Sequence, residues 1–382
     1  MRIMIVRRVP GSTFSLEVYA DNLVAGLKTV RPNWEIAEIA PIPWNSSDKL
    51  YLSGLGIKKY YETFWRHPHA VSRLKADIFH VLDQSDAHIV YRLHRANKPV
   101  VVTCHDLVQF IYPEILRDQS RIPALSTAMW KYSVRGMEKA NHVIAVSTNT
   151  AEDITQMLKI KPEKITVALN GITSEFQVLP TSEVSEIRKQ YTPSPDTFCL
   201  LNVGSTHQRK NILTVLRVLK DLKEQGFPIC LWKTGDRFTQ EQQAFIQAHD
   251  LESYIFNLGN PDKARLVQIY NAADVLLAPS LYEGFGLTIV EAMACGTPVI
   301  TSNVSSLPEV VGDAGIMIDP NCPQAIADAV IELYKNPVLY ANLIEKGLAR
   351  SQFFSWQNTA EQVATIYEKT FATYKIGIFN DL

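Results

Sequence analysis

Cysteine is scarce and scattered in this sequence. Only five of the 382 residues are cysteines, and no two of them form a C-x-x-C pair. This spacing argues against a disulfide framework or a zinc site, and it predicts thiols that behave as small buried residues in a reducing compartment. The five are Cys104, Cys199, Cys230, Cys295 and Cys322.

Long hydrophobic runs are also missing. No uninterrupted apolar stretch approaches the ~20 residues of a membrane-spanning helix. At the start of the sequence, the apolar stretch 1–6 is short and is followed directly by Arg7 and Arg8. That is not the pattern of a secretory signal peptide, so we expect a cytoplasmic protein.

There is little net charge, but the charge is unevenly distributed. Residues 1–178 carry 22 Lys and Arg against 17 Asp and Glu, whereas the remainder carries 16 against 22, and the whole chain sums to −1. A basic N-terminal half favours an anionic acceptor, or peripheral contact with the inner face of an anionic membrane. Cations scattered over solvated faces explain it equally well. Without a clustered basic stripe, nucleic acid is not an expected partner.

Two motifs of nucleotide-binding enzymes are absent. No G-x-G-x-x-G follows the first apolar segment, which argues against a dinucleotide dehydrogenase. No Asp-x-Asp metal motif is present either, so we expect no bound metal ion.

The length and the apolar pattern predict two α/β domains. A single core stops growing at about 250–300 residues. Apolar strands alternate with amphipathic segments in both halves, which predicts Rossmann-like domains with mainly parallel sheets. The polar stretch 180–195 separates the halves, and we place the domains at 1–178 and 179–356. Strands are expected at 2–6, 78–82, 99–103, 142–146, 198–203, 229–233, 255–258, 274–278 and 299–302.

The most informative stretch contains Glu283 and Glu291, two carboxylates eight positions apart around a glycine-bearing loop. The apolar segment 274–278 before it reads as a buried parallel strand, so Glu283 lies at the carboxyl end of a strand. Ligands bind at that edge in open α/β sheets. Carboxylates accept hydrogen bonds from sugar or ribose hydroxyls.

A helix is expected to begin directly after Phe285. Gly286 has no Cβ and lets the backbone approach a ligand closely. The amides of Gly286, Leu287 and Thr288 open the helix, and the positive end of a helix suits a phosphate. A phosphate at the helix tip and hydroxyls on the two carboxylates together describe a nucleotide-sugar.

With GFGLTIVEAMACGTPVI around it, this stretch resembles the signature of retaining GT-B glycosyltransferases of family 4, also called glycosyl transferases group 1. A surface Glu and a Glu in the first turns of a helix are the simpler interpretation of an isolated pair. The glycines, the preceding strand and the following Cys-Gly-Thr-Pro turn favour the family signature instead.

The resemblance implies a fold, a reaction and a set of partners. The fold is GT-B, two Rossmann-like domains with mainly parallel sheets facing across a cleft, and the last helix, about 357–382, returns to the N-terminal domain. The reaction moves a hexose from a nucleotide-diphosphate sugar, with retention, to a hydroxyl of a glycan, lipid or small-molecule acceptor. No metal or other cofactor is implied.

The resemblance also assigns roles on the donor side. Glu283 would hold sugar hydroxyls and Glu291 the ribose. Lys210 matches the family's phosphate-binding Lys in the loop 203–211. Ser205 stands where the family's Arg usually follows Val-Gly, and Arg209 matches an Arg-Lys-Asn form found in part of the family.

Three further positions carry weaker matches. His105 follows an apolar strand, and the resemblance places it against the donor sugar on the acceptor side, with Asp106 capping a helix or orienting the histidine. Gly11 stands where many members have paired glycines close to the donor phosphates. Gly259 ends a strand in a turn whose backbone lines the base pocket.

Other functions and surfaces stay open at this stage. A GT-B epimerase or phosphorylase, or a non-catalytic sugar-nucleotide-binding protein, would share the architecture. The aromatic segment 51–69 would form an acceptor wall, a membrane-contacting helix or an ordinary helix packed on the sheet. Its aromatic and histidine residues are Tyr51, Tyr60, Tyr61, Phe64, Trp65, His67 and His69.

Overall fold

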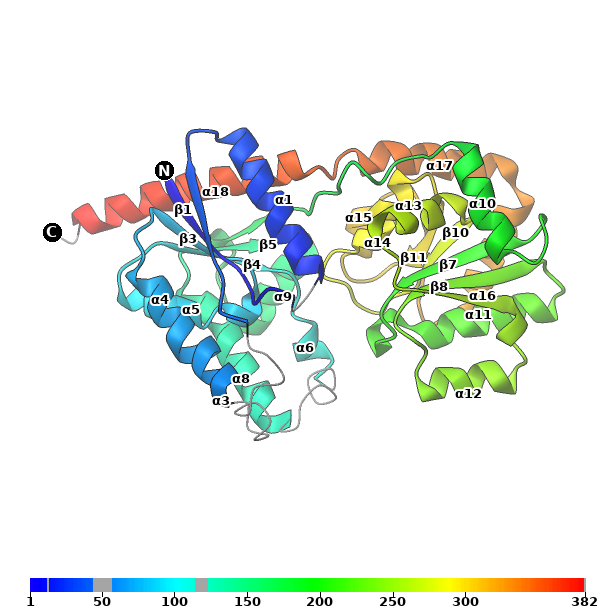
Figure 1. Cartoon of the computed structure of the whole chain (residues 1–382), viewed down its shortest axis with the longest axis horizontal. Coiled ribbons are helices and arrows are strands. Elements are labelled where there is room, and N and C mark those ends of the chain that lie inside the picture. Colours follow the sequence, from blue (N-terminus) through cyan, green and yellow to red (C-terminus); the bar gives the residue numbers. More distant parts are fainter. Residues whose placement is uncertain (12–13, 44–56, 114–122, 381–382) are drawn as a thin grey trace. The chain divides into compact units, whose positions relative to one another are not determined.

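The computed structural model describes residues 1–11, 14–43, 57–113 and 123–380. The chain divides into two compact units, Met1–Gly171 with Trp356–Leu382, and Ile172–Ser355 (Figure 1). Of the helices that lie in the described ranges, none combines the length and apolar character needed to cross a membrane.

The first division falls earlier than the sequence-based boundary at residue 178. The polar stretch expected to separate the halves is mostly helix α10, Thr181–Tyr191, of the second unit. Only Ile187 of this helix is buried, and Arg188 pairs with Asp274 at 2.8 Å. Because one side of this helix faces solvent, its sequence is polar like that of a linker.

The first unit is a six-stranded, fully parallel sheet in the order β2-β1-β3-β4-β5-β6. Alternate side chains of its strands enter two separate apolar clusters, one on each face. Burial on both faces is the reason these segments read as continuous apolar runs. The strands are β1 (Arg2–Val6), β2 (Glu35–Ile39), β3 (Ile78–Val81), β4 (Val100–Cys104), β5 (His142–Ala145) and β6 (Ile165–Val167).

Helices cover both faces of this sheet (Figure 1). On one face α18 packs along α1, and Arg31 at the end of α1 pairs with Glu361 at 2.7 Å and Glu368 at 2.8 Å. The helices are α1 (Phe14–Val30), α3 (Ile57–Tyr61), α4 (His67–Arg73), α5 (Ile89–Arg95), α6 (Val108–Ile111), α8 (Pro123–Arg135), α9 (Thr148–Leu158) and α18 (Trp356–Asn380). Short turns of other helix types are Glu62–Arg66, Gln84–Asp86, Gly136–Lys139 and Pro162–Lys164.

The second unit is also a six-stranded parallel sheet, in the order β12-β11-β10-β7-β8-β9. Its strands are β7 (Phe198–Gly204), β8 (Ile229–Gly235), β9 (Ile255–Gly259), β10 (Val275–Ala278), β11 (Val299–Ser302) and β12 (Ile316–Ile318). Besides α10, its helices are α11 (Ile212–Glu224), α12 (Gln240–Ala248), α13 (Lys263–Ala272), α14 (Leu287–Ala294), α15 (Leu307–Val311), α16 (Pro323–Lys335) and α17 (Pro337–Ser351).

The strand order of the second sheet creates a switch point between β7 and β10. From β7 the chain moves outward to β8 and β9, and it then returns to the other side of β7 to form β10. The connections that leave β7 and β10 therefore diverge to opposite faces, and they leave a crevice at the carboxyl ends of these two neighbouring strands. The candidate residues of the second unit lie at this edge.

Candidate functional site

Two loops meet at the switch point of the second unit. One follows β7 and ends in the short helical turn Gln208–Lys210, and the other connects β10 to α14. Asn211 joins them, because its Nδ2 donates to the carbonyl oxygen of Pro279 at 3.1 Å. The Leu281 amide also donates to the carbonyl oxygen of Arg209 at 2.7 Å. The sequence predicted each loop at a strand end, and the structure brings them into contact.

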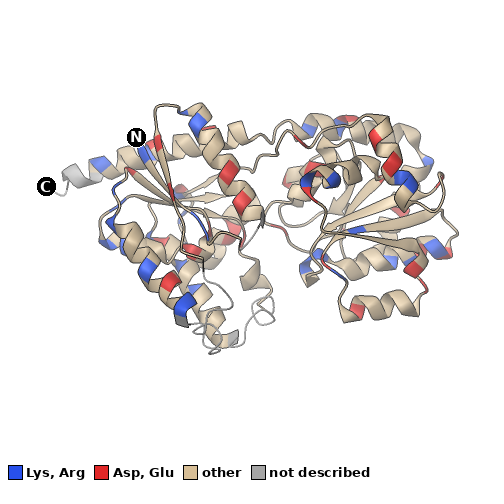
Figure 2. Cartoon of the chain, viewed as in Figure 1, with Lys and Arg blue, Asp and Glu red and all other residues tan. Residues whose placement is uncertain are grey.

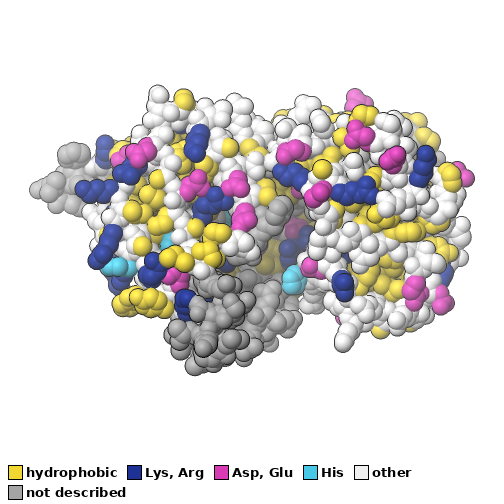
Figure 3. Space-filling view, viewed as in Figure 1, with side chains coloured by type: hydrophobic (Ala, Val, Ile, Leu, Met, Phe, Trp, Pro, Cys, Tyr) yellow, Lys and Arg dark blue, Asp and Glu magenta, His cyan; other side chains and the backbone are white. Residues whose placement is uncertain are grey.

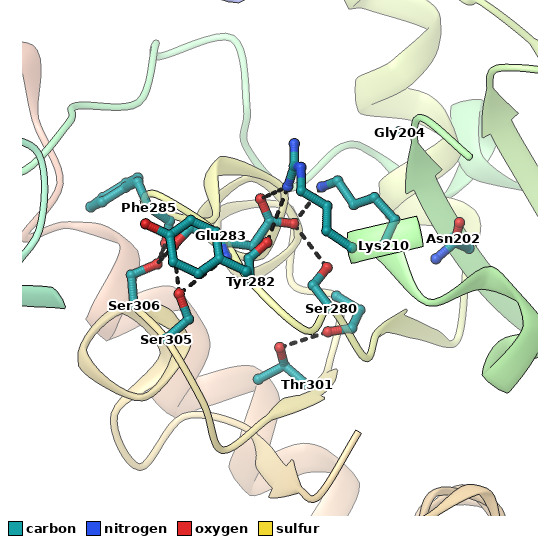
Figure 4. A network of polar contacts seen from close by, with 12 residues as sticks. Asn202, Gly204, Lys210, Ser280, Tyr282, Glu283, Phe285, Thr301, Ser305 and Ser306 are labelled. Atoms are coloured by element: carbon teal, nitrogen blue, oxygen red, sulfur yellow. Dashed lines mark hydrogen bonds and ion pairs between the residues drawn. The ribbon is translucent and has the colours of Figure 1, made fainter. Parts of the chain in front are cut away.

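The carboxylate of Glu283 is the centre of this contact (Figure 4). Its Oε1 lies 2.6 Å from Nζ of Lys210, and its Oε2 lies 2.6 Å from Nη1 of Arg209. The hydroxyl of Ser280 donates to Oε1 at 2.8 Å. Glu283 is only 8% exposed. Three residues proposed from two separate motifs thus form one nearly buried ionic cluster.

The cluster keeps Glu283 ionised. Burial alone would raise the pKa of its carboxyl group, but the charges of Lys210 and Arg209 and the hydrogen bonds to the carboxylate lower it to about 2. An ionised carboxylate only accepts hydrogen bonds. At neutral pH the site therefore presents one acceptor group beside two cations, which suits a ligand carrying hydroxyls next to phosphate.

Two serines that the sequence analysis missed fix the Glu283 loop. Ser305 accepts a hydrogen bond from the Glu283 amide at 3.1 Å and donates to its carbonyl oxygen at 2.7 Å. The hydroxyl of Ser306 lies 2.9 Å from the carbonyl oxygens of both Glu283 and Phe285. The available signal was a helix start, Ser-Ser before Leu-Pro-Glu, that follows β11 at the same edge of the sheet.

Ser305 holds an unusual backbone conformation to make these bonds. Its φ is +60°, in the left-handed region that costs an L-residue roughly 1–2 kcal/mol. Such conformations persist where the surrounding contacts impose them, and they cluster at functional sites. The carboxylate of Glu283 is thereby held from its main chain as well as from its side chain.

Helix α14 begins beside this carboxylate. Gly286 precedes it with φ +103°, a conformation that favours glycine, and a Cβ there would lie 2.9 Å from Cδ2 of Leu307. Leu287 and Thr288 form the first turn, with their amides at the positive end of the helix. The side chain of Phe285 is buried and packs edge-to-face on Phe354, so only its backbone is placed to meet a ligand.

Glu291 lies one turn further along α14. Its Oε2 accepts a hydrogen bond from the hydroxyl of Tyr270 at 2.7 Å. Burial raises the pKa of this carboxyl group, while the Tyr270 hydrogen bond and nearby lysines act in the opposite direction. Tyr270 orients Glu291 from α13, a contact that the sequence gave no reason to expect.

Gly259 lies at the same edge but two strands from β7. With residues of the β8 end it lines a hollow of about 590 Å³, whose other walls include Asp236, Arg237 and Asn257. The Gly259 amide donates to Oδ1 of Asn257 at 3.1 Å. At about 4.8 Å per strand, Gly259 is roughly 14 Å from the β10 edge, so it is not part of the Glu283 cluster.

His105 belongs to the first unit and follows β4. Its Nε2 lies 2.8 Å from the carbonyl oxygen of Leu82, which can only accept a hydrogen bond, so this nitrogen carries a proton. Its amide donates to Oε1 of Gln84 at 3.0 Å, and the Tyr19 ring packs edge-on at 4.7 Å. The ring is thereby held in one orientation by contacts with neighbouring residues of the first unit.

The other first-unit candidates lie close to strand ends. The Gly11 amide donates to the carboxylate of Glu17, and the two following residues lie outside the described ranges. Next to Gly11, Pro10 borders a hollow of about 420 Å³ at the ends of β1, β2 and β3. Asp106 accepts a hydrogen bond from the Val108 amide at 3.1 Å, close to the start of α6.

The aromatic segment divides between packing and exposure. His67 is buried, Phe64 packs on the His88 ring at 4.4 Å, and Tyr61 and Trp65 are exposed. Tyr51 lies outside the described residues. Ordinary helix packing therefore explains one side of this segment, and the other side faces solvent.

Sequence comparison places both units in known families. Residues 35–176 match Glycosyltransferase Family 4, and residues 183–350 match Glycosyl transferases group 1. The chain is 29% identical over 286 residues to O-antigen chain mannosyltransferase B of Escherichia coli, covering 74% of this chain and 72% of that protein. It is 27% identical over 304 residues to the serotype-specific mannosyltransferase WbdA of Escherichia coli, covering 76% of this chain but 36% of that longer protein.

A solved structure shares the fold. HepE of Anabaena, crystallised with UDP-glucose, aligns with a TM-score of 0.77 at 19% identity, over 97% of this chain and all of that one. Two α/β units with parallel sheets, together with the similarity to this structure, define the GT-B fold. The chain belongs to glycosyltransferase family 4 and is a glycosyltransferase, which confirms the family and fold predicted from the sequence.

Proposed function

We propose that this glycosyltransferase moves a hexose from a nucleoside diphosphate sugar to a hydroxyl of a glycan, lipid or small-molecule acceptor, with retention of anomeric configuration and without a metal ion. The observation that carries this proposal is the cluster of Glu283 with Lys210 and Arg209 beside the first turn of α14. This cluster places a carboxylate that can accept hydrogen bonds from sugar hydroxyls next to two cations that can bind phosphate.

The two cations bind and stabilise the leaving diphosphate. As the bond between the sugar and the diphosphate breaks, negative charge grows on the phosphate oxygens, and preorganised cations stabilise that charge. Lys210, Arg209 and the amides of Gly286 to Thr288 supply positive charge for this purpose. Since these groups do the work that a divalent cation does elsewhere, transfer is expected to proceed in EDTA.

Glu283 acts on the sugar. Its ionised carboxylate accepts hydrogen bonds from sugar hydroxyls, and its negative charge favours the oxocarbenium-like centre that forms as the diphosphate departs. The acceptor hydroxyl attacks the same face, and a phosphate oxygen takes its proton. No protein carboxylate nucleophile is needed. Glu291 binds the ribose through its Oε1, Gly259 lies on the base side, and His105 and Gly11 serve the acceptor side.

Similar proteins support this donor and suggest an acceptor. HepE, which shares the fold, was crystallised with UDP-glucose, and mannosyltransferase B is named for an O-antigen chain. For this chain we propose a cytoplasmic enzyme of polysaccharide biosynthesis, with a glycan or lipid-linked acceptor.

A donor screen tests the proposal. UDP-, GDP-, ADP- and dTDP-sugars are added in EDTA, and thermal unfolding and release of free sugar are measured. We expect one nucleoside family to raise the unfolding temperature and to lose its sugar slowly, because water replaces the missing acceptor. A ligand at 100 times its Kd stabilises the folded state by about 2.7 kcal/mol, which such an assay detects.

Two results of the screen would contradict the proposal. If none of the four nucleoside families stabilises the protein, the proposed nucleotide-sugar donor is refuted. If sugar is released only after a divalent ion is added, the proposed metal independence is refuted. Interconversion of the donor sugar without transfer would identify an epimerase.

One layer of first-unit helices suits an anionic lipid surface, which we propose as its partner (Figures 2 and 3). The elements α3, Glu62–Arg66, α4, α5, α8 and Gly136–Lys139 carry nine Lys and Arg against two Glu. Each Lys or Arg near an anionic membrane contributes about 1 kcal/mol. Large apolar side chains on the same layer are exposed: Trp65 (63%), Tyr61 (54%), Tyr132 (50%) and Leu125 (44%).

Vesicle sedimentation tests this surface. We expect the protein to sediment with phosphatidylglycerol vesicles at low salt, and to stay in solution with phosphatidylcholine or at high salt, because screening weakens surface electrostatics. Trp65→Ala with Lys131→Glu should reduce sedimentation, whereas Lys220→Glu on α11 of the second unit should not. Equal binding to both lipids, or no binding to either, would refute the membrane contact.

A further inference from the structure

A buried lysine lies near the carboxyl end of β8. Lys233 is 0% exposed, although lysine is among the residues least often fully buried in proteins. Ile229 and Leu231, which precede it on the same side of the strand, belong to the apolar core under α11 and α16. Burying an ammonium group in this position costs free energy unless the group is hydrogen-bonded.

The ammonium group ties two strand ends together. Nζ of Lys233 donates to the carbonyl oxygen of Gly204 at 2.6 Å and also to that of Thr234. Gly204 is the last residue of β7, and it pairs with Gly235 at the end of β8. The two ends are so close that a Cβ at Gly235 would lie 2.2 Å from the Gly204 carbonyl oxygen.

Gly204 therefore lies between two lysines. Lys233 holds its carbonyl oxygen, and Nζ of Lys210 would lie 3.6 Å from a Cβ added at Gly204. Gly204 also begins the loop that carries Arg209 and Lys210 to the Glu283 cluster. A shift of this one peptide would move the cation that contacts Glu283.

We propose that Lys233 is a positioning residue for the donor diphosphate. It fixes the start of the Lys210 loop through the Gly204 carbonyl, and its buried charge adds to the positive potential that a diphosphate meets above β7 and β8. This inference rests on the proposed function, because it assumes that the diphosphate binds at Lys210.

The charge and the hydrogen bonds can be separated by pH. The pKa of Lys233 is lowered to about 8, mainly by burial; the charge of Asp236 opposes this shift and that of Lys210 reinforces it. A neutral amine still has two N–H groups for the two carbonyl oxygens, so raising the pH removes the charge and leaves the clamp. A purely structural lysine would then leave diphosphate affinity unchanged.

The experiment measures binding of UDP, GDP, ADP and dTDP by calorimetry to the wild type, Lys233→Met and the control Leu231→Met. We expect Lys233→Met to bind the preferred diphosphate about tenfold more weakly, as for loss of one charged contact. The Leu231→Met variant, a volume-conserving change on the same strand, should bind as the wild type does.

The pH profile keeps the test decisive if Lys233→Met fails to fold. Between pH 7 and 8.5 the wild type should lose about threefold in affinity, as expected for a group of pKa about 8 that contributes tenfold. A folded Lys233→Met should show no such loss. Unchanged affinity in Lys233→Met refutes the inference alone, and a flat wild-type profile refutes the contribution of the buried charge. Absence of wild-type binding to all four diphosphates refutes the proposed donor as well.

Discussion

Replacing Glu283 by Gln lowers sugar transfer by about a hundredfold to a thousandfold and leaves the chain folded. Preorganised charged groups commonly contribute this much to catalysis. The amide keeps the shape of the side chain but removes the charge that favours a positive sugar ring. It also gives up the charge-assisted hydrogen bonds to sugar hydroxyls, which are about twice as strong as neutral ones. Initial rates with the preferred donor, with circular dichroism as the folding check, give the result.

Glu224→Gln is the matched control. Glu224 lies at the end of α11, its side chain is 59% exposed, and it pairs with Lys220 away from the switch point. This variant should transfer sugar at the wild-type rate. If a folded Glu283→Gln also does so, Glu283 has no part in the reaction.

Replacing Lys210 by Ala lowers both turnover and donor affinity. Lys210 is the cation closest to Oε1 of Glu283, and its side chain is only 15% exposed, so its interactions are weakly screened by solvent. Its loss should reduce turnover by about a hundredfold or more, since negative charge grows on the diphosphate in the transition state. Steady-state kinetics over a range of donor concentrations separate the two effects.

The comparison for this variant is Lys220→Ala. Lys220 lies on α11, the helix that follows Lys210, and pairs with Glu224 at 2.9 Å and Asp221 at 3.6 Å. Replacing it shows what the loss of a lysine outside the candidate site does to the kinetics. We expect wild-type kinetics. A Lys210→Ala enzyme with unchanged kcat and KM would show that the donor phosphates bind elsewhere.

The main residues of the candidate site could be predicted from the sequence because they come directly after the ends of predicted strands. Residues 299–302 were predicted as a strand and form β11. Glu283 and Lys210 each followed an apolar strand, and the parallel sheet brings those ends to one edge. Their direct contact depends on β7 and β10 being neighbours, which is a property of the strand order and not of either motif.

The supporting residues were beyond a sequence reading. Ser305 and Tyr270 act through backbone conformation and a long-range hydrogen bond, and neither leaves a local pattern. Lys233 sits inside an apolar strand, where its hydrogen bonds to two carbonyl oxygens explain a charge that the pattern alone does not.

Three edge strands were also missed. β2, β6 and β12 lie at the ends of their sheets, and their side chains are only partly buried. A strand that packs on one side only, or hardly at all, lacks the continuous apolar run by which the central strands were found.

The most direct test of the account is the affinity of the preferred nucleoside diphosphate for the wild type and Glu283→Gln, measured side by side by calorimetry. In the unliganded protein Glu283 neutralises the two cations, so its loss frees them for phosphate. The account predicts that Glu283→Gln binds the diphosphate as tightly as the wild type or several-fold more tightly, although it no longer transfers sugar. Weaker binding by Glu283→Gln would contradict the account, because it would show that the carboxylate, and not the cations beside it, holds the diphosphate end of the donor.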